Sequence, residues 1–124
     1  TVAQDVVIDN LIENVAIERG DAALLTYADC GNWLAAEQRE VTQNHSLGVV
    51  VVSLRDQLLS LELGFQPDPS DPSAVASVIA VGTETRTTKT AGQLPVTTHK
   101  PFDALLWLAW SSSTRRYLVC DTGT

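Results

Sequence analysis

The chain has 124 residues, of which 44% are hydrophobic and 19% are charged, a length and composition that suit one domain with its own core and exclude wholesale disorder. The net charge of −7 argues against a nucleic-acid partner, because phosphate contacts need a basic patch. No apolar run is long enough to span a bilayer, so we expect no membrane partner either.

The charge is distributed unevenly along the chain. Residues 1–65 carry ten acids and three bases, whereas residues 66–124 carry five of each. The acidic half is also the half with helical patterns, so we interpret the acids as a solvated helix face.

The N-terminal segment has the pattern of an amphipathic helix. Its apolar residues recur at i, i+3 and i+4, while its acids lie off that stripe. Gly20 ends this helix, and Asp21 can cap a second, short helix over residues 22–27. The stripe consists of Val7, Ile8, Leu11, Ile12, Val15 and Ala16.

The middle of the chain contains patterns typical of both helices and strands. Residues 33–41 favour a helix by propensity, although a short strand also fits. Residues 47–52 are β-branched and predict a buried strand. Ser53 can then cap a third helix over residues 54–63, and residues 67–72 form a proline-rich surface loop.

The last fifty residues read as strands. We predict strands over residues 74–81, 83–90, 96–110 and 117–121, with the third interrupted near Pro101. Residues 83–90 are polar on both faces, as in an edge strand or the wall of a wet cavity. The turns are too short for crossover helices, so the sheet should be an antiparallel meander. The predicted fold is α+β, one domain over residues 1–124, with N-terminal helices on a curved, mainly antiparallel sheet.

Two cysteines, Cys30 and Cys120, allow one disulfide but have no metal-binding spacing. We interpret both as reduced, packed thiols, as is common in cytosolic chains. With no leader sequence visible, we expect a cytoplasmic location, although a chain whose signal has been removed would look the same. We expect no metal and no cofactor.

Several segments resemble the SnoaL-like family of the NTF2-like superfamily. Residues 18–29 are similar to that family's junction between two helices, and residues 53–56 to the start of its next helix. Residues 85–92 resemble its threonine-rich strand, and residues 117–122 resemble its closing strand, which ends in Asp-Thr. The resemblance implies a cone-shaped α+β barrel whose helices close a central pocket.

The family includes isomerases, cyclases, hydrolases, dehydratases and non-catalytic binding modules, so the fold alone constrains function poorly. The resemblance implies that Asp121, at the end of the last strand, is a general acid or base inside the apolar cone. Tyr117 alternates onto the same face and would be its hydrogen-bond partner. The alternative is that Asp121 only caps the chain end.

The chain also departs from the family. Leu108 stands where many members have a histidine, and His99 could replace that histidine only if the strand register is shifted. Arg86 could pair with Asp121 as in the hydrolases, provided that both line the pocket. The candidate substrate contacts are Tyr27, Trp33, Arg86, Leu106, Leu108 and Trp110.

Two functions follow as expectations. The first is a cofactor-free enzyme that isomerises, cyclises or hydrates a small apolar or polycyclic molecule, with Asp121, Tyr117 and His99 as catalytic candidates. The second is a non-catalytic module that binds a ligand or serves in an assembly. Residues 104–110 are apolar on both faces of the predicted strand, and both faces must be shielded from water. We therefore also expect a homodimer.

Overall fold

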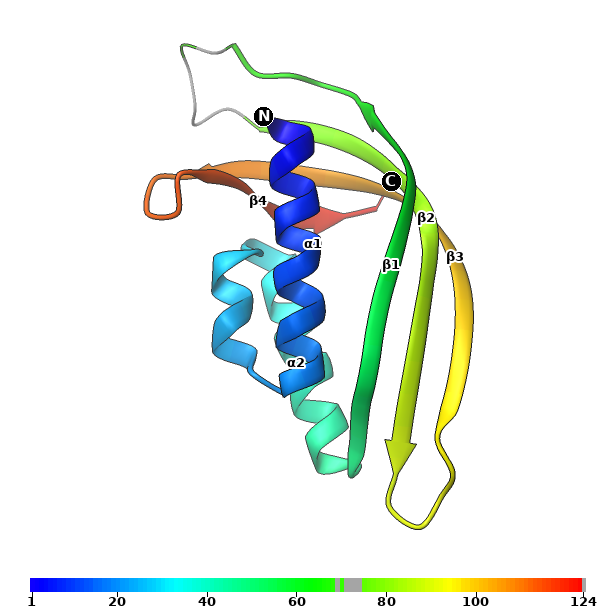
Figure 1. Ribbon diagram of the computed structural model, residues 1–124. Helices are drawn as coiled ribbons and strands as arrows, with labels where there is room; N and C mark the ends of the chain where they lie inside the picture. Colours follow the sequence, from blue (N-terminus) through cyan, green and yellow to red (C-terminus); the bar gives the residue numbers. More distant parts are fainter. Residues whose placement is uncertain (69, 71–74, 124) are drawn as a thin grey trace.

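The computed structural model describes residues 1–68, 70 and 75–123. Three helical elements precede four strands, which form one antiparallel sheet in the order β1-β2-β3-β4. The helices lie against the concave face of this curved, open sheet (Figure 1), which confirms the predicted α+β fold. The elements are α1 (Val2–Arg19), the 3-10 helix η1 (Ala22–Tyr27), α2 (Gly31–Ser46), β1 (Val49–Leu63), β2 (Ala76–Thr90), β3 (Val96–Ser111) and β4 (Arg116–Thr122).

Local capping sets the ends of the first two helices. The Thr1 side chain accepts a hydrogen bond from the backbone of Gln4, which satisfies a free N–H in the first turn of α1. Gly20 ends α1 with a φ of 65°, a left-handed conformation that glycine adopts without strain. Asp21 then caps η1 by accepting a hydrogen bond from the backbone of Leu24.

The orientation of α1 differs from the one that its apolar stripe predicts, although Ala16 of the stripe is buried. Asp9 and Asn14 are buried against the sheet, together with Val6, Ala16 and Ile17. Much of the stripe instead faces outwards, namely Val7, Ile8, Leu11 and Val15. The interpretation of the acids as a solvated face is therefore wrong for this helix, and it is also wrong for the buried Asp29 and Glu37.

The predicted third helix over residues 54–63 is wrong, because these residues belong to β1. β1 pairs with β2 from Val49 opposite Thr90 to Leu63 opposite Val78. This long-range ladder overrides the helical propensity of the leucines. The ambiguous residues 33–41 are helical and lie within α2.

The strands predicted over residues 74–81 and 83–90 form one strand, β2, from Ala76 on, and residue 74 lies outside the described residues. β2 lies inside the sheet rather than at its edge. β3 is also continuous, with Pro101 paired opposite Thr83. β4 pairs only with Leu106 to Ser111, so the missing N–H of Pro101 breaks no bond on that side. The loop predicted over residues 67–72 lies partly outside the described residues, which omit 69, 71 and 72.

A close approach of backbones accompanies the curvature of the sheet. A Cβ atom at Gly82 would lie 2.3 Å from the Gln57 carbonyl oxygen and 2.7 Å from the Phe102 ring. Beside it, β1 contains an irregularity between Leu58 and Ser60, of the kind that bends a strand and increases its twist. The bend leaves room between the concave face and the helices.

The apolar core has two parts, both between the helices and the sheet. One is built around Leu25 and Leu54, and the other around Val78 and Leu108. Among the described residues, no helix is long and apolar enough to cross a membrane.

Candidate functional site

A cavity of about 260 Å³ lies between the two parts of the core. α1 and α2 cover it on one side, and the concave face of the sheet forms the other. Much of its wall is apolar and comes from all four strands as well as both helices. The apolar lining residues are Val6, Ile17, Trp33, Leu54, Leu58, Ala80, Phe102, Ala104, Leu106 and Val119.

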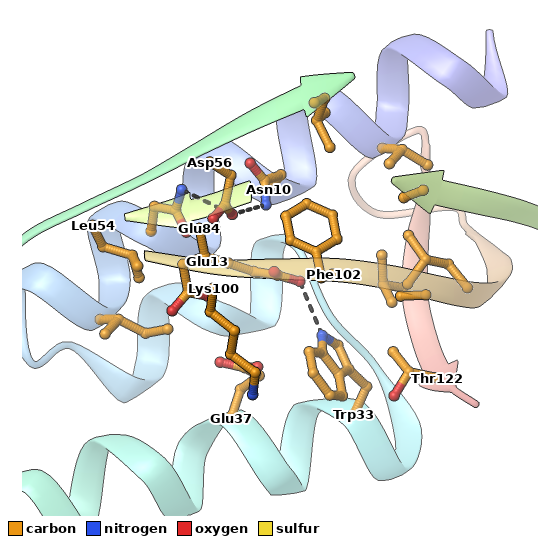
Figure 2. A pocket seen from close by; sticks show the side chains of 18 of the residues that line it. Asn10, Glu13, Trp33, Glu37, Leu54, Asp56, Glu84, Lys100, Phe102 and Thr122 are labelled. Carbon is orange, nitrogen blue, oxygen red and sulfur yellow. Dashed lines mark hydrogen bonds between the residues drawn. The ribbon is translucent and has the colours of Figure 1, made fainter. Parts of the chain in front are cut away.

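Four acids line this cavity, and one of them, Glu84, is paired with Arg86. The other three carboxyl groups come from three different elements (Figure 2) and form no ion pair among the described residues. They belong to Glu13 on α1, Glu37 on α2 and Asp56 on β1. Oδ2 of Asp56 accepts hydrogen bonds from the side-chain amides of Asn10, at 2.6 Å, and Asn14, at 3.4 Å. Oε1 of Glu13 accepts one from the indole N–H of Trp33, at 3.1 Å.

Two oxygen atoms in this group are buried without a hydrogen-bond partner among the described residues. They are Oε2 of Glu37, a residue only 8% exposed, and Oδ1 of Asp56. An unsatisfied buried acceptor costs about 1–3 kcal/mol. The pocket therefore presents acceptors that a donor group on a ligand would satisfy.

Burial changes the protonation of these acids. It raises the pKa of Glu37 to about 8, and repulsion from Glu13 and Glu40 adds to the effect. Burial also raises the pKa of Glu13, although hydrogen bonds to its carboxylate offset part of the increase. Glu37 can therefore gain or lose a proton near neutral pH.

Two more acids, Asp9 and Asp29, are buried but do not line the pocket. Burial raises the pKa of Asp9 to about 8, with partial compensation from Arg116, whose Nη2 lies 3.5 Å from Oδ1 of Asp9. Burial and the neighbouring Glu13 raise the pKa of Asp29. The helical half of the chain thus buries an unusual number of carboxyl groups.

The basic residues of the pocket differ in their pairing. Arg86 forms ion pairs with Glu40 and with Glu84, whose Oε1 lies 3.0 Å from its Nε. Lys100 is exposed and forms no ion pair among the described residues. Figure 2 shows its side chain extending towards Glu37.

Asp121 does not lie in this pocket, contrary to the prediction. It is exposed, pairs in register with Trp107, and its Oδ1 accepts a hydrogen bond from the backbone N–H of Thr122. The reason is a bulge at Cys120, since Val119 pairs with Leu108 and the next pair on β4 is Asp121 with Trp107. One extra residue turns the following side chains to the opposite face, so Thr122 lines the pocket instead.

The other two catalytic candidates also lie elsewhere. His99 is exposed on β3, with Nδ1 3.0 Å from the Thr85 hydroxyl. The ring of Tyr117 packs edge-on against Trp110, with 5.3 Å between the centroids. The pocket wall includes neither tyrosine nor histidine.

The six predicted substrate contacts divide into two groups. Trp33, Arg86 and Leu106 line the pocket. The remaining three do not, because Tyr27 is exposed at the end of η1, Leu108 is fully buried in the core, and Trp110 packs on Tyr117.

Sequence reasoning missed the four acids of the pocket wall, Glu13, Glu37, Asp56 and Glu84. The only sequence feature that could have indicated their place in the wall was their position on the same face as core residues. Glu37, for example, lies four residues before the buried Val41, and residues four apart share one face of a helix. The described residues contain no group of three or more His, Cys, Asp or Glu side chains placed to hold a metal ion.

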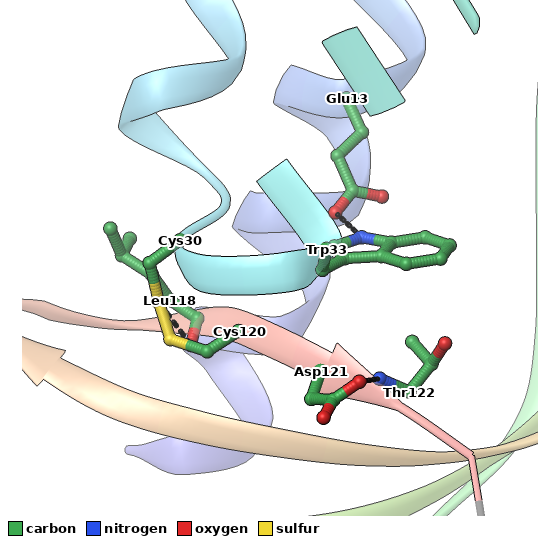
Figure 3. The surroundings of a disulfide bond; sticks show 7 residues. All are labelled: Glu13, Cys30, Trp33, Leu118, Cys120, Asp121 and Thr122. Atoms are coloured by element: carbon green, nitrogen blue, oxygen red, sulfur yellow. Dashed lines mark hydrogen bonds between the residues drawn. A yellow bond between two sulfur atoms is a disulfide. The ribbon is translucent and has the colours of Figure 1, made fainter. Parts of the chain in front are cut away.

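A disulfide joins Cys30 to Cys120 across 90 residues, so the prediction of reduced thiols is wrong. It fastens the start of α2 to the bulge in β4 (Figure 3). Backbone bonds reinforce this junction, since the Cys30 N–H donates to the Val119 carbonyl at 2.9 Å. Trp33 lies in the first turn of α2, so the same junction positions its indole against Glu13.

Comparison with known proteins shows a similarity of fold and no similarity to a named family. No family model and no curated protein sequence matches the chain. Among solved structures, the chain is similar to the intermembrane space region of the chloroplast protein ARC6, with a TM-score of 0.73 and 17% identity. The match covers 98% of this chain and 92% of that one, so the two share a fold over nearly their whole length.

We expect the disulfide to contribute strongly to stability. Replacing Cys30 and Cys120 together by serine should lower the free energy of unfolding by about 2–4 kcal/mol, because the open chain gains conformational entropy when it unfolds. Urea unfolding of both proteins measures the difference. A reductant should destabilise the wild type and leave the double variant unchanged, and equal stability of oxidised and reduced wild type would contradict the prediction.

The raised pKa values predict that stability falls as pH rises. Glu37 and Asp9 ionise near pH 4 when unfolded and near pH 8 when folded, so the folded state holds the extra protons between these values. Each group should therefore cost up to about 1.4 kcal/mol per pH unit across this window. The melting temperature should be higher at about pH 5 than at about pH 8.

Glu37→Gln should flatten this pH dependence and stabilise the protein on the alkaline side, because it removes a buried charge. Glu62→Gln is the matched control, since Glu62 is exposed on β1 and the change removes the same formal charge. A melting curve for Glu37→Gln with the wild-type slope would show that Glu37 is not the titrating group.

Proposed function

We propose that this chain binds a small, mainly apolar molecule in the cavity between its helices and its sheet. The observation that carries the proposal is a cavity with a largely apolar wall and buried acceptor oxygens that lack partners among the described residues. Ligand pockets commonly combine an apolar wall with a few polar groups that fix orientation. The exposure of Asp121 favours binding over the catalysis first expected for that residue.

A second candidate is an enzyme that uses general acid or base catalysis in the same pocket. Glu37 supports it, because burial brings its pKa to about 8, close to the pH at which it would exchange a proton. In this case Glu37, rather than Asp121, would be the acid or base for an isomerisation, cyclisation or hydration. Turnover that persists in Glu37→Gln would exclude this role.

We also propose membership of the SnoaL-like group. The support is the order of the elements, with a helix ending at Gly20-Asp21, two further helical elements and an antiparallel meander around a pocket. The cytoplasmic location stays a prediction, and the disulfide argues against it because disulfides persist mainly in oxidising compartments.

The ligand proposal predicts a thermal shift that depends on the cavity. A screen of small apolar molecules should yield one that stabilises the wild type, by about 2.7 kcal/mol at a concentration of one hundred times its Kd. Ala104→Phe should abolish this shift, because Ala104 lines the cavity and a phenyl group would occupy it.

Asp121→Asn is the matched control, since Asp121 lies outside the cavity and asparagine keeps the acceptor for Thr122. It should bind like the wild type. Circular dichroism checks that Ala104→Phe is folded, and Leu106→Trp provides a second way to fill the cavity. A shift that survives both filled variants would place the ligand elsewhere and contradict the proposal.

We further propose a homodimer that forms through the outer face of the sheet. Val50, Val52 and Trp107 are exposed and alternate with inward residues, so this face is partly apolar. Light scattering at micromolar concentration should give the dimer mass for the wild type and the monomer mass for Trp107→Gln. Leu11→Gln, on the exposed side of α1, should remain dimeric, and a monomeric wild type would overturn the proposal.

A further inference from the structure

We propose that the occupant of this pocket is an organic cation, a substituted ammonium ion with an apolar body. The inference rests on the proposed binding function and specifies the chemistry of the ligand. It follows from the combination of converging carboxyl groups with aromatic rings in one cavity. Neither feature would carry it alone.

The first observation is the surplus of acceptors. Glu13, Glu37 and Asp56 approach the cavity from α1, α2 and β1. Oε2 of Glu37 is buried within a residue that is only 8% exposed, and it has no hydrogen-bond partner among the described residues. The positive charge of a cation beside these groups would offset the cost of burying their negative charge, and an ammonium ion that keeps an N–H would also donate to their acceptors.

The second observation is the aromatic wall. Trp33 and Phe102 both line the cavity, and Figure 2 shows them close to the labelled carboxyl groups. The negative faces of aromatic rings attract ammonium groups, most strongly where water is excluded. Trp33 is also held in place by its hydrogen bond to Glu13, so its ring is positioned before a ligand enters.

The basic residues of the pocket offset its acids only in part, and the charge of Arg86 partly counters the raised pKa of Glu37. On β2, Arg86 and Glu84 pair with each other, and Arg86 also pairs with Glu40 of α2. On β3, Lys100 is exposed and has no ion pair among the described residues. The only lining residue of β4 besides Val119 is the uncharged Thr122.

The charge of Lys100 affects cationic and anionic ligands in opposite ways. Lys100 lines the same cavity as Glu37, so its positive charge would repel an incoming cation. An anionic ligand would instead be attracted to Lys100 and repelled by the three acids. The effect of removing Lys100 thus distinguishes the two ligand charges.

The test uses a matched pair of probes, benzyltrimethylammonium and neopentylbenzene, which differ only in a charged nitrogen replaced by carbon. Calorimetry or thermal shift at about pH 8.5, where Glu37 is largely ionised, should give the cation at least about tenfold tighter binding. Because the probe has no titratable proton, its affinity should fall as the pH decreases to about 6 and Glu37 takes up a proton.

Variants assign the effect to the pocket. Glu37→Gln should weaken binding of the cation by about tenfold and remove its pH dependence, because the attraction between the two charges is lost, while it leaves neopentylbenzene unaffected. Lys100→Gln should strengthen binding of the cation, and Asp121→Asn should change neither probe. A structural role for Glu37 alone would not produce this difference between the probes.

The outcomes separate the two proposals. Equal binding of both probes, or binding of neopentylbenzene alone, overturns the cation inference and leaves the apolar binding function standing. Weaker cation binding in Lys100→Gln also overturns it, because removing a positive charge from the pocket wall should favour a cation bound there. If neither probe binds and the apolar screen also yields no ligand, the proposed function fails together with the inference.

Discussion

The burial of the polar side of α1 against the concave sheet shapes the rest of the molecule. Asp9 and Asn14 lie in the interior, while Leu11 and Val15 face outwards. Desolvation makes this orientation costly, and the structure compensates through specific partners, such as Arg116 beside Asp9. The same orientation of α1 places an acid in the pocket, because the side chain of Glu13 reaches the cavity only with the helix turned this way.

The sheet provides the space that α1 borders. Its bend coincides with the close contact of Gly82 with Gln57 and with the irregularity beside Leu58. A flat sheet would pack directly against the helices and leave no cavity between the two parts of the core. Because Phe102 packs over Gly82 and also lines the pocket, the residue that permits the bend also places an aromatic ring in the wall.

The junction of α2 with β4 links the helical side of the pocket to the sheet side. The disulfide and the hydrogen bond from Cys30 to Val119 fix the first turn of α2, which contains Trp33, and Glu37 follows one turn later. The bulge at Cys120 decides which residues of β4 face inwards. One inserted residue thus exchanges Asp121 for Thr122 in the pocket wall.

The sequence by itself determined the features that depend on local chemistry. The cap at Gly20 and Asp21 sets the break between the first helices, and the short turns after β2 and β3 require antiparallel pairing. Only the tertiary structure decided which side of α1 is buried, that residues 54–63 extend β1, and that Asp121 points outwards. Each of these features depends on contacts with residues distant in the chain. Neither helical periodicity nor strand alternation can predict where a bulge occurs or which strands pair.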